Sequence, residues 1–309
     1  ALAQAVLTVA MAPVLLGWID QCRAWLQNRR GAGVLQPYRG LRKLFLKDAV
    51  IATNASAIFR ASPYVQFGAM ALAAAIIPVF STRPLLATSA DTIALVGLFA
   101  VARVFAALAG MDVGTAFGTL GARREMLVGF LSEPALLMVF FAASLLTQST
   151  LLPVIVETLS HRELGIYPSQ AFAGVAFVMV LLAENARIPI DNPATHLELT
   201  MIHEAMVLEY SGRHLAMIEL GSALKLLLYL SLIGSVFLPA GVAHPGDGLA
   251  GYGVGLAAYL AKLTVGALLL AVFETAIAKM RVFRVPQFLG AALMLGFLAT
   301  LLLFVSRGL

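Results

Sequence analysis

Residues 287–305 read QFLGAALMLGFLATLLLFV, and none of their side chains is charged. An α-helix rises about 1.5 Å per residue, so about 20 apolar residues cross the ~30 Å hydrocarbon core of a bilayer. Other segments of the chain are apolar over a similar length, although a few ionisable residues interrupt them. We therefore predict eight membrane spans, at about residues 1–20, 63–82, 91–110, 126–147, 169–184, 215–238, 252–275 and 287–305.

The composition of the whole chain agrees with this prediction. Hydrophobic residues make up 61% of the 309 residues and charged residues 12%, whereas soluble domains carry roughly 25% charged residues. The apolar runs are continuous and do not alternate with polar residues, which argues against a β-barrel. We expect an all-α membrane protein with a single polytopic domain over residues 1–309.

Two local features refine the predicted spans. The first span begins without a basic segment or a small-residue cleavage site, so we expect a true span and not a signal peptide. Pro63 is expected to open the second span, where a proline does least harm to a helix.

The basic residues predict the orientation of the chain. Fifteen of the 21 Lys and Arg residues fall in four loops, residues 21–62, 111–125, 185–214 and 276–286. The loops on the other side contain three, Arg83, Arg162 and Arg307. Because cytoplasmic loops carry the excess of Lys and Arg, we place the four basic loops on the cytoplasmic side of the cell's inner membrane. Both termini are then on the opposite side.

The loop of residues 21–62 contains the segment QNRRGAGVLQPYRGLRKLFLKD. Its LRKLFLKD part is amphipathic, and two interpretations are open. The segment is either a helix on the lipid surface that follows the positive-inside rule, or part of a docking surface for a cytoplasmic partner.

The sequence lacks the motifs of several common cofactor sites. Cys22 is the single cysteine, which excludes an intrachain disulfide, a Cys-ligated iron–sulfur cluster and a Cys-rich zinc site within this chain. No glycine-rich phosphate loop follows a predicted strand, so we expect no nucleotide site, and we expect no nucleic-acid partner.

Ionisable residues inside the predicted spans are candidates for function, because each costs roughly 2.5–3.5 kcal/mol at bilayer depth. Two interpretations are open: static ion pairs that join helices, or groups along a proton path. The number of these residues favours the path. The candidates in or at the ends of the spans are Arg103, Glu133, Glu184, Glu219, Lys225, Lys262 and Glu274.

The segment ENARIPIDNPATHLELTMIHEAMVLEYSG, residues 184–212, is unusually acidic. Pro189 and Pro193 prevent a regular helix at its start, and we predict a new helix over residues 195–210. At 100° per residue, the carboxylates of Glu198 and Glu209 share one face of this helix, and His196 and His203 share another. The five acids of the segment are Glu184, Asp191, Glu198, Glu204 and Glu209.

Three interpretations of this segment compete. A zinc-protease motif fails because HExxH would need histidine at position 207, where this chain has valine. His196 and His203 are seven residues apart, which is too far for one ion, so we expect no metal site. A solvated surface helix leaves the intervening apolar residues unexplained. A tilted helix at the cytoplasmic boundary that passes protons to buried acids fits best.

Several motifs together resemble a known family. EYSG at residues 209–212 follows Glu184, Arg187, Pro189 and Asp191 in the pattern of the H-type membrane subunit of complex I. The wider segment is more similar to the corresponding subunit of group 4 membrane-bound [NiFe]-hydrogenases, which include formate hydrogenlyase and energy-converting hydrogenase. NRRGAG and LQPYR within residues 28–39, GMDVGTAFGTLGARRE at 110–125 and SEP at 132–134 fit the same family.

This resemblance implies an eight-helix subunit that has no cofactor of its own. Its partners would be the hydrogenase large and small subunits, a ferredoxin-like iron–sulfur subunit and antiporter-like membrane subunits, with the Ni-Fe centre and iron–sulfur clusters in the partner subunits. Its acids would begin a proton path, from Glu198–Glu209 through Glu184 and Glu133 to the sixth and seventh spans. Arg187 would be a charge partner. The docking residues would be Arg29, Arg30, Arg39, Arg123 and Arg124.

Two alternatives remain. One is the H-type subunit of a quinone-reducing complex I, although Ala32 and the longer acidic segment differ from that pattern and favour the hydrogenase branch. The other is a stand-alone ion or solute transporter, against which stand the absence of an internal repeat and the long basic loop.

Overall fold

The computed structural model describes residues 1–161, 168–191, 201–244 and 246–306, and these residues form helices and loops without an extended strand. Eight helices are long: α1 (Leu2–Leu26), α3 (Ala57–Ile76), α4 (Thr92–Asp112), α5 (Ala116–Thr147), α7 (Pro168–Glu184), α9 (Gly212–Leu232), α10 (Gly248–Ala276) and α11 (Val285–Ser306). The shorter elements are α2 (Gln36–Phe45), α6 (Leu152–Ser160), α8 (His203–Val207), the 3₁₀ turns η1 (Ala87–Ser89) and η3 (Val282–Arg284), and the π-helical turn η2 (Ile233–Phe237).

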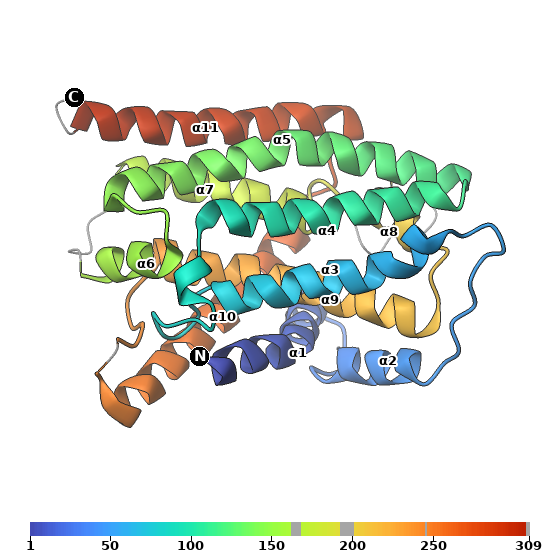
Figure 1. Cartoon of the computed structure of the whole chain (residues 1–309), viewed down its shortest axis with the longest axis horizontal. Coiled ribbons are helices and arrows are strands. Elements are labelled where there is room, and N and C mark those ends of the chain that lie inside the picture. The colour runs from blue at the N-terminus through green and yellow to red at the C-terminus, as the bar shows by residue number, and fades with distance from the viewer. Residues whose placement is uncertain (162–167, 192–200, 245, 307–309) are drawn as a thin grey trace.

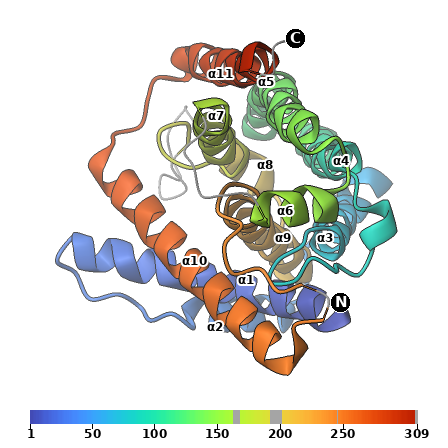
Figure 2. The same ribbon diagram turned by 90° about the vertical axis from the view of Figure 1, so that its left-hand side faces the viewer.

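The long helices form a bundle. Six of them, α3, α4, α5, α7, α9 and α11, run along its long axis, whereas α1 and α10 cross them obliquely on one side (Figures 1 and 2). Helix α9 lies inside this arrangement, and its Tyr229 is fully buried. The Tyr229 ring stacks on Phe99 at 4.9 Å between centroids and packs against Phe177 at 5.7 Å. Aromatic contacts therefore join α9 to α4 and α7.

The prediction of an all-α membrane protein is confirmed. Among the described residues, six helices are long and apolar enough to cross a membrane: Leu2–Leu26, Thr92–Asp112, Ala116–Thr147, Gly212–Phe237, Gly248–Ala276 and Val282–Ser306. The remaining predicted spans, 63–82 and 169–184, correspond to α3 and to the 17-residue α7, which are not among the six. Eight crossings therefore stay a prediction.

Several helix ends differ from the predicted span boundaries by six residues or more: α1 ends at Leu26 and not near residue 20, α3 is Ala57–Ile76 and not 63–82, and α5 starts early. Residues 111–125 were expected to form a loop, but α5 begins at Ala116, so the connection between α4 and α5 is only residues 113–115. The Thr115 side chain accepts the Gly118 N–H and caps α5. This cap starts the helix ten residues before the first long apolar run.

Pro63 also does not open its helix. Helix α3 begins at Ala57, where the Ser56 hydroxyl accepts the N–H of Ile58, and Pro63 lies inside it. A proline at this position cannot donate to the carbonyl four residues earlier. That carbonyl, on Phe59, instead accepts the Tyr210 hydroxyl at 2.8 Å, so a partner from elsewhere in the chain makes the proline tolerable.

The acidic segment after α7 is irregular, as its prolines predict. Over the described residues 201–210, however, the predicted helix is reduced to the five residues of α8. One carboxylate oxygen of Asp191 accepts the N–H groups of Ile202 and His203 at 3.1 and 3.2 Å. These bonds satisfy donors at the N-terminus of α8 and set where it begins. Glu198, on the predicted helix, lies outside the described residues.

Candidate functional site

The buried guanidinium of Arg103, on α4, is the centre of a group of carboxylates. Its Nη1 lies 2.6 Å from Glu133 Oε1 and its Nε lies 3.6 Å from Glu125 Oε1, and both glutamates are on α5. Its Nη2 pairs with Glu184 at the end of α7. The Arg103 side chain is 2% exposed, so these acids and not water compensate its charge.

Glu184 connects this group to α9. Its second oxygen lies 2.9 Å from Nζ of Lys225, and the Ser132 hydroxyl donates to its first oxygen. Together with Arg103, Glu125 and Glu133, these residues form what we call the Arg103 cluster: Arg103, Glu125, Glu133, Glu184 and Lys225. Three carboxylates and two cations, from four helices, therefore share one network, in which Arg103 and Glu184 are fully buried and the Glu133 side chain is 34% exposed.

Two further charged groups lie next to the Arg103 cluster. Glu274 on α10 is buried and pairs with Arg187 at 3.3 Å and with Arg23 of α1 at 3.6 Å. Asp191 pairs with Lys279 at 3.1 Å in addition to capping α8. These contacts fix the irregular segment after α7 to the cytoplasmic-side ends predicted for the first and seventh spans.

A cavity of about 400 Å³ joins these groups. At about 30 Å³ per molecule, a space of this size holds on the order of ten waters. Its ionisable lining comes from α1, α4, α5, α7, α8, α9 and the segment after α7, and consists of Asp20, Arg23, Arg103, Glu125, Glu184, Arg187, Asp191, His203, Glu204 and Lys225. The arrangement provides proton-accepting and proton-donating groups along one cavity that is large enough for several waters.

Known proteins match this chain over nearly its whole length. The family model described as NADH dehydrogenase matches residues 1–305. The chain belongs to this family. It is 35% identical to formate hydrogenlyase subunit 4 of Escherichia coli over 298 residues, which cover 96% of each chain. It is also 35% identical to hydrogenase-4 component C of the same organism, over 79% of this chain and 76% of that one.

Members named for quinone reduction are more distant. The H-type subunit of NADH-quinone oxidoreductase from Rickettsia bellii is 27% identical over 69% of this chain and 64% of its own length. A solved structure of the membrane-bound sulfane sulfur reductase, an archaeal respiratory membrane complex, has a chain with the same fold, at a TM-score of 0.80 and 19% identity. It covers 97% of this chain and 98% of its own. The family resemblance stated from the motifs is confirmed, and the chain is a homologue of subunits of membrane respiratory complexes.

The structure brings together most of the residues that were predicted to belong to the proton path or to be charge partners. Arg103, Glu184, Arg187, Asp191, Glu204 and Lys225 line the cavity, and Glu133 and Glu274 contact residues that line it. Glu209 and Glu219 are exposed and lie outside the lining. The role of each residue in a proton path stays a prediction.

Lys262 lies elsewhere. Its Nζ donates to the carbonyl of Gly234 at 2.9 Å and to that of Leu238, at the π-helical end of α9. Carbonyls at a helix C-terminus lack intrahelical partners, so the ammonium group satisfies them. Lys262 was predicted to belong to the proton path together with the other charged residues inside the spans. The sequence does not show that the end of another helix lies beside this residue of α10.

Five residues of the site were not among the predicted site residues: Asp20, Arg23, Glu125, His203 and Lys279. Glu125 was available from the sequence, because it lies eight residues before Glu133 and α5 extends through both. The prediction of a loop over residues 111–125 separated the two glutamates. Arg23 and Lys279 needed the tertiary structure, since their partners Glu274 and Asp191 are distant in sequence.

The predicted docking arginines lie in the loop after α1, on α2 and in the first turns of α5, and both α2 and the start of α5 lie toward the right of Figure 1. Arg29, Arg30, Arg39 and Arg123 are exposed. Arg124 is half-buried and donates to the Met201 carbonyl at 3.1 Å, so part of its hydrogen-bonding capacity serves this chain.

Proposed function

We propose that this chain is the membrane-anchor and proton-relay subunit of a membrane-bound [NiFe]-hydrogenase complex of the formate hydrogenlyase type. Its 35% identity to formate hydrogenlyase subunit 4 over nearly the whole chain supports the complex type. The hydrogenase large and small subunits and a ferredoxin-like iron–sulfur subunit would dock on the end with the exposed arginines. They would carry the Ni-Fe centre and the clusters, and antiporter-like subunits would bind within the membrane.

The observation that carries the relay is Glu184, which pairs with Arg103 and with Lys225 beside the cavity. With every group ionised, the Arg103 cluster has three negative and two positive charges. One added proton therefore makes the cluster neutral. Neutralisation is favourable because an uncompensated negative charge in the interior is costly. The cluster can therefore accept one proton from the cavity and release it when a neighbouring charge changes.

In this mechanism, electron transfer in the docked arm changes the charge near the cavity. A proton enters past Glu204 and Asp191, reaches Glu184 and leaves through Glu133 towards the neighbouring membrane subunits. Lys225 and Arg103 keep the carboxylates in position and compensate their charge. The basic loops face the cytoplasm and both termini face the opposite side.

The test uses the assembled complex in membrane vesicles. Glu133→Gln and Glu204→Gln remove a titrating proton while keeping side-chain size, so we expect assembly to be retained and proton translocation per hydrogen formed to fall at least ten-fold. Asp48→Asn, an exposed acid on the α2–α3 loop, is the matched control. Normal coupled activity in both glutamine variants would contradict the relay.

A quinone-reducing complex is the second candidate, because the H-type subunit of NADH-quinone oxidoreductase is a relative. Solvent extraction of the purified complex, followed by measurement of bound quinone, distinguishes the two candidate functions. Quinone bound in proportion to this chain, or inhibition by quinone-site inhibitors, would favour the second candidate, whereas nickel in the co-purified soluble subunits would favour the first.

A further inference from the structure

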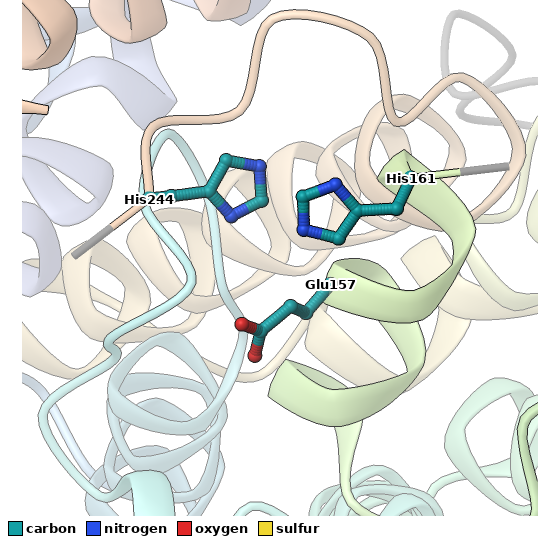
Figure 3. Close-up of side chains that lie close together, drawn as sticks. All are labelled: Glu157, His161 and His244. Atoms are coloured by element: carbon teal, nitrogen blue, oxygen red, sulfur yellow. The ribbon is translucent and has the colours of Figure 1, made fainter. Parts of the chain in front are cut away.

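Three potential metal ligands lie together at the end of the molecule away from α8. Glu157 and His161 belong to α6 and the residue that caps it, and His244 belongs to the loop between η2 and α10. One ligand atom from each lies within 4.8 Å of the other two. Figure 3 shows the carboxylate and both imidazole rings pointing toward one another.

The backbone of two elements, α6 and the loop before α10, positions these three side chains. Glu157 and His161 are four residues apart, so they project from the same face of α6. On the other element, the Ala243 N–H donates to the Phe80 carbonyl at 2.9 Å, and the His244 N–H donates to Asp247 at 2.6 Å. The position of His244 is therefore set by bonds that do not involve its ring.

The two rings already contact each other. The His161 and His244 rings stack at 4.8 Å between centroids, with an angle of 18° between their planes. An imidazole ring binds a metal ion through one of its two nitrogens, and each of these rings offers one such nitrogen to the group. Nε2 of His244 lies 3.3 Å from the Ser160 hydroxyl, and its buried Nδ1 has no hydrogen-bond partner among the described residues.

We propose that Glu157, His161 and His244 form a binding site for a divalent transition-metal ion of the Zn²⁺ type. Two imidazoles and one carboxylate are a ligand set that zinc uses in proteins, with a fourth position left for water. Bonds of about 2.0–2.2 Å place tetrahedral ligand atoms between about 3 and 4 Å apart. The present ligand atoms lie within 4.8 Å of one another, and the exposed Glu157 and His161 side chains would rotate to bring them to that separation when a metal binds.

A metal at this site joins α6 to the loop that leads into α10. These segments are far apart in sequence, and α6 lies at the opposite end of the molecule from α8, which lines the cavity beside the Arg103 cluster (Figure 1). The sequence predicted no metal from the single cysteine, the incomplete HExxH motif and the spacing of His196 and His203, whereas His244 is distant in sequence from Glu157 and His161. The site is independent of the proposed proton relay, so failure of one proposal leaves the other standing.

The test measures metal binding to the full chain in its purified complex. The complex is stripped with EDTA, exchanged into chelator-free buffer and titrated with Zn²⁺, and a parallel sample is loaded with Co²⁺ for absorption spectra. We expect His161→Ala and Glu157→Gln to weaken this binding on the order of ten-fold or more, because each removes a ligand. The tetrahedral Co²⁺ absorption should disappear with it.

The matched control is Thr158→Ala, an exposed neighbour on α6 that is not one of the three ligands, which should bind Zn²⁺ as the original chain does. Because His161 and Glu157 are exposed, their variants test the site even where His244→Ala fails to fold. Equal Zn²⁺ affinity and equal Co²⁺ spectra in the original chain, His161→Ala and Glu157→Gln would overturn the site, as would no binding at all to the original chain.

Discussion

The guanidinium of Arg103 lies directly against Gly129. A Cβ atom added at Gly129 would lie 2.5 Å from Nη1 and 2.6 Å from Cδ of Arg103. Helix α5 therefore leaves out a side chain at the point where α4 brings its buried cation. This absence lets Arg103 reach Glu133 and Glu184 together.

We expect Gly129→Ala to displace the Arg103 side chain and lower coupled turnover several-fold. Alanine favours a helix over glycine by about 1 kcal/mol, so α5 itself should not be weakened. The measurement is proton translocation per hydrogen formed in vesicles, with the amount of assembled complex recorded. Gly97→Ala is the control, since nothing lies within 4 Å of a Cβ at that position of α4. Equal coupling in the two variants would show that the site accommodates the methyl group.

Removing the Arg103 charge should destabilise the protein. Arg103→Met leaves the Arg103 cluster with three carboxylates and one cation, and breaking a buried pair typically costs about 3–5 kcal/mol. Glu184→Gln removes one of the uncompensated charges, so we expect the double variant to lose less stability than the two single losses added together. Thermal unfolding of the purified chain checks this expectation. Strict additivity would mean that Arg103 and Glu184 do not depend on each other.

The bond from Tyr210 to the Phe59 carbonyl gives a second double-variant test. Burial raises the pKa of Tyr210, so its hydroxyl keeps its proton and donates throughout the physiological range. Tyr210→Phe keeps the ring stacked on Phe59, at 4.0 Å between centroids, but leaves the carbonyl without this donor. We expect Tyr210→Phe to lower the free energy of unfolding by about 1–3 kcal/mol, because the buried carbonyl is left without its donor.

The proline explains why this loss should be conditional. In a Pro63→Ala background the alanine N–H can donate to the Phe59 carbonyl, as in an uninterrupted helix. Tyr210→Phe should then cost less than it does with Pro63 present. An equal cost in both backgrounds, measured by unfolding, would mean that the tyrosine does not substitute for the missing helical bond.

Local patterns were enough for much of the fold. Apolar length predicted α1, α4, α9, α10 and α11 to within a few residues at most of their ends, because burial in lipid depends on the composition of each segment alone. The prolines after Glu184 predicted the break in the chain for the same local reason. Boundaries failed at α3 and α5, where the Ser56 and Thr115 caps start the helices six and ten residues before the predicted spans.

Consecutive residues are enough to identify an all-α membrane protein of the NADH dehydrogenase family with acids concentrated after α7. Which side chains meet follows from the packing of the helices: Glu125 with Arg103, Glu184 with Lys225, Lys262 with the end of α9, and His161 with His244. Hydropathy is summed along a segment, so it can be read from consecutive residues. An ion pair depends on the rotation and register of two packed helices, which are set only when the whole bundle forms.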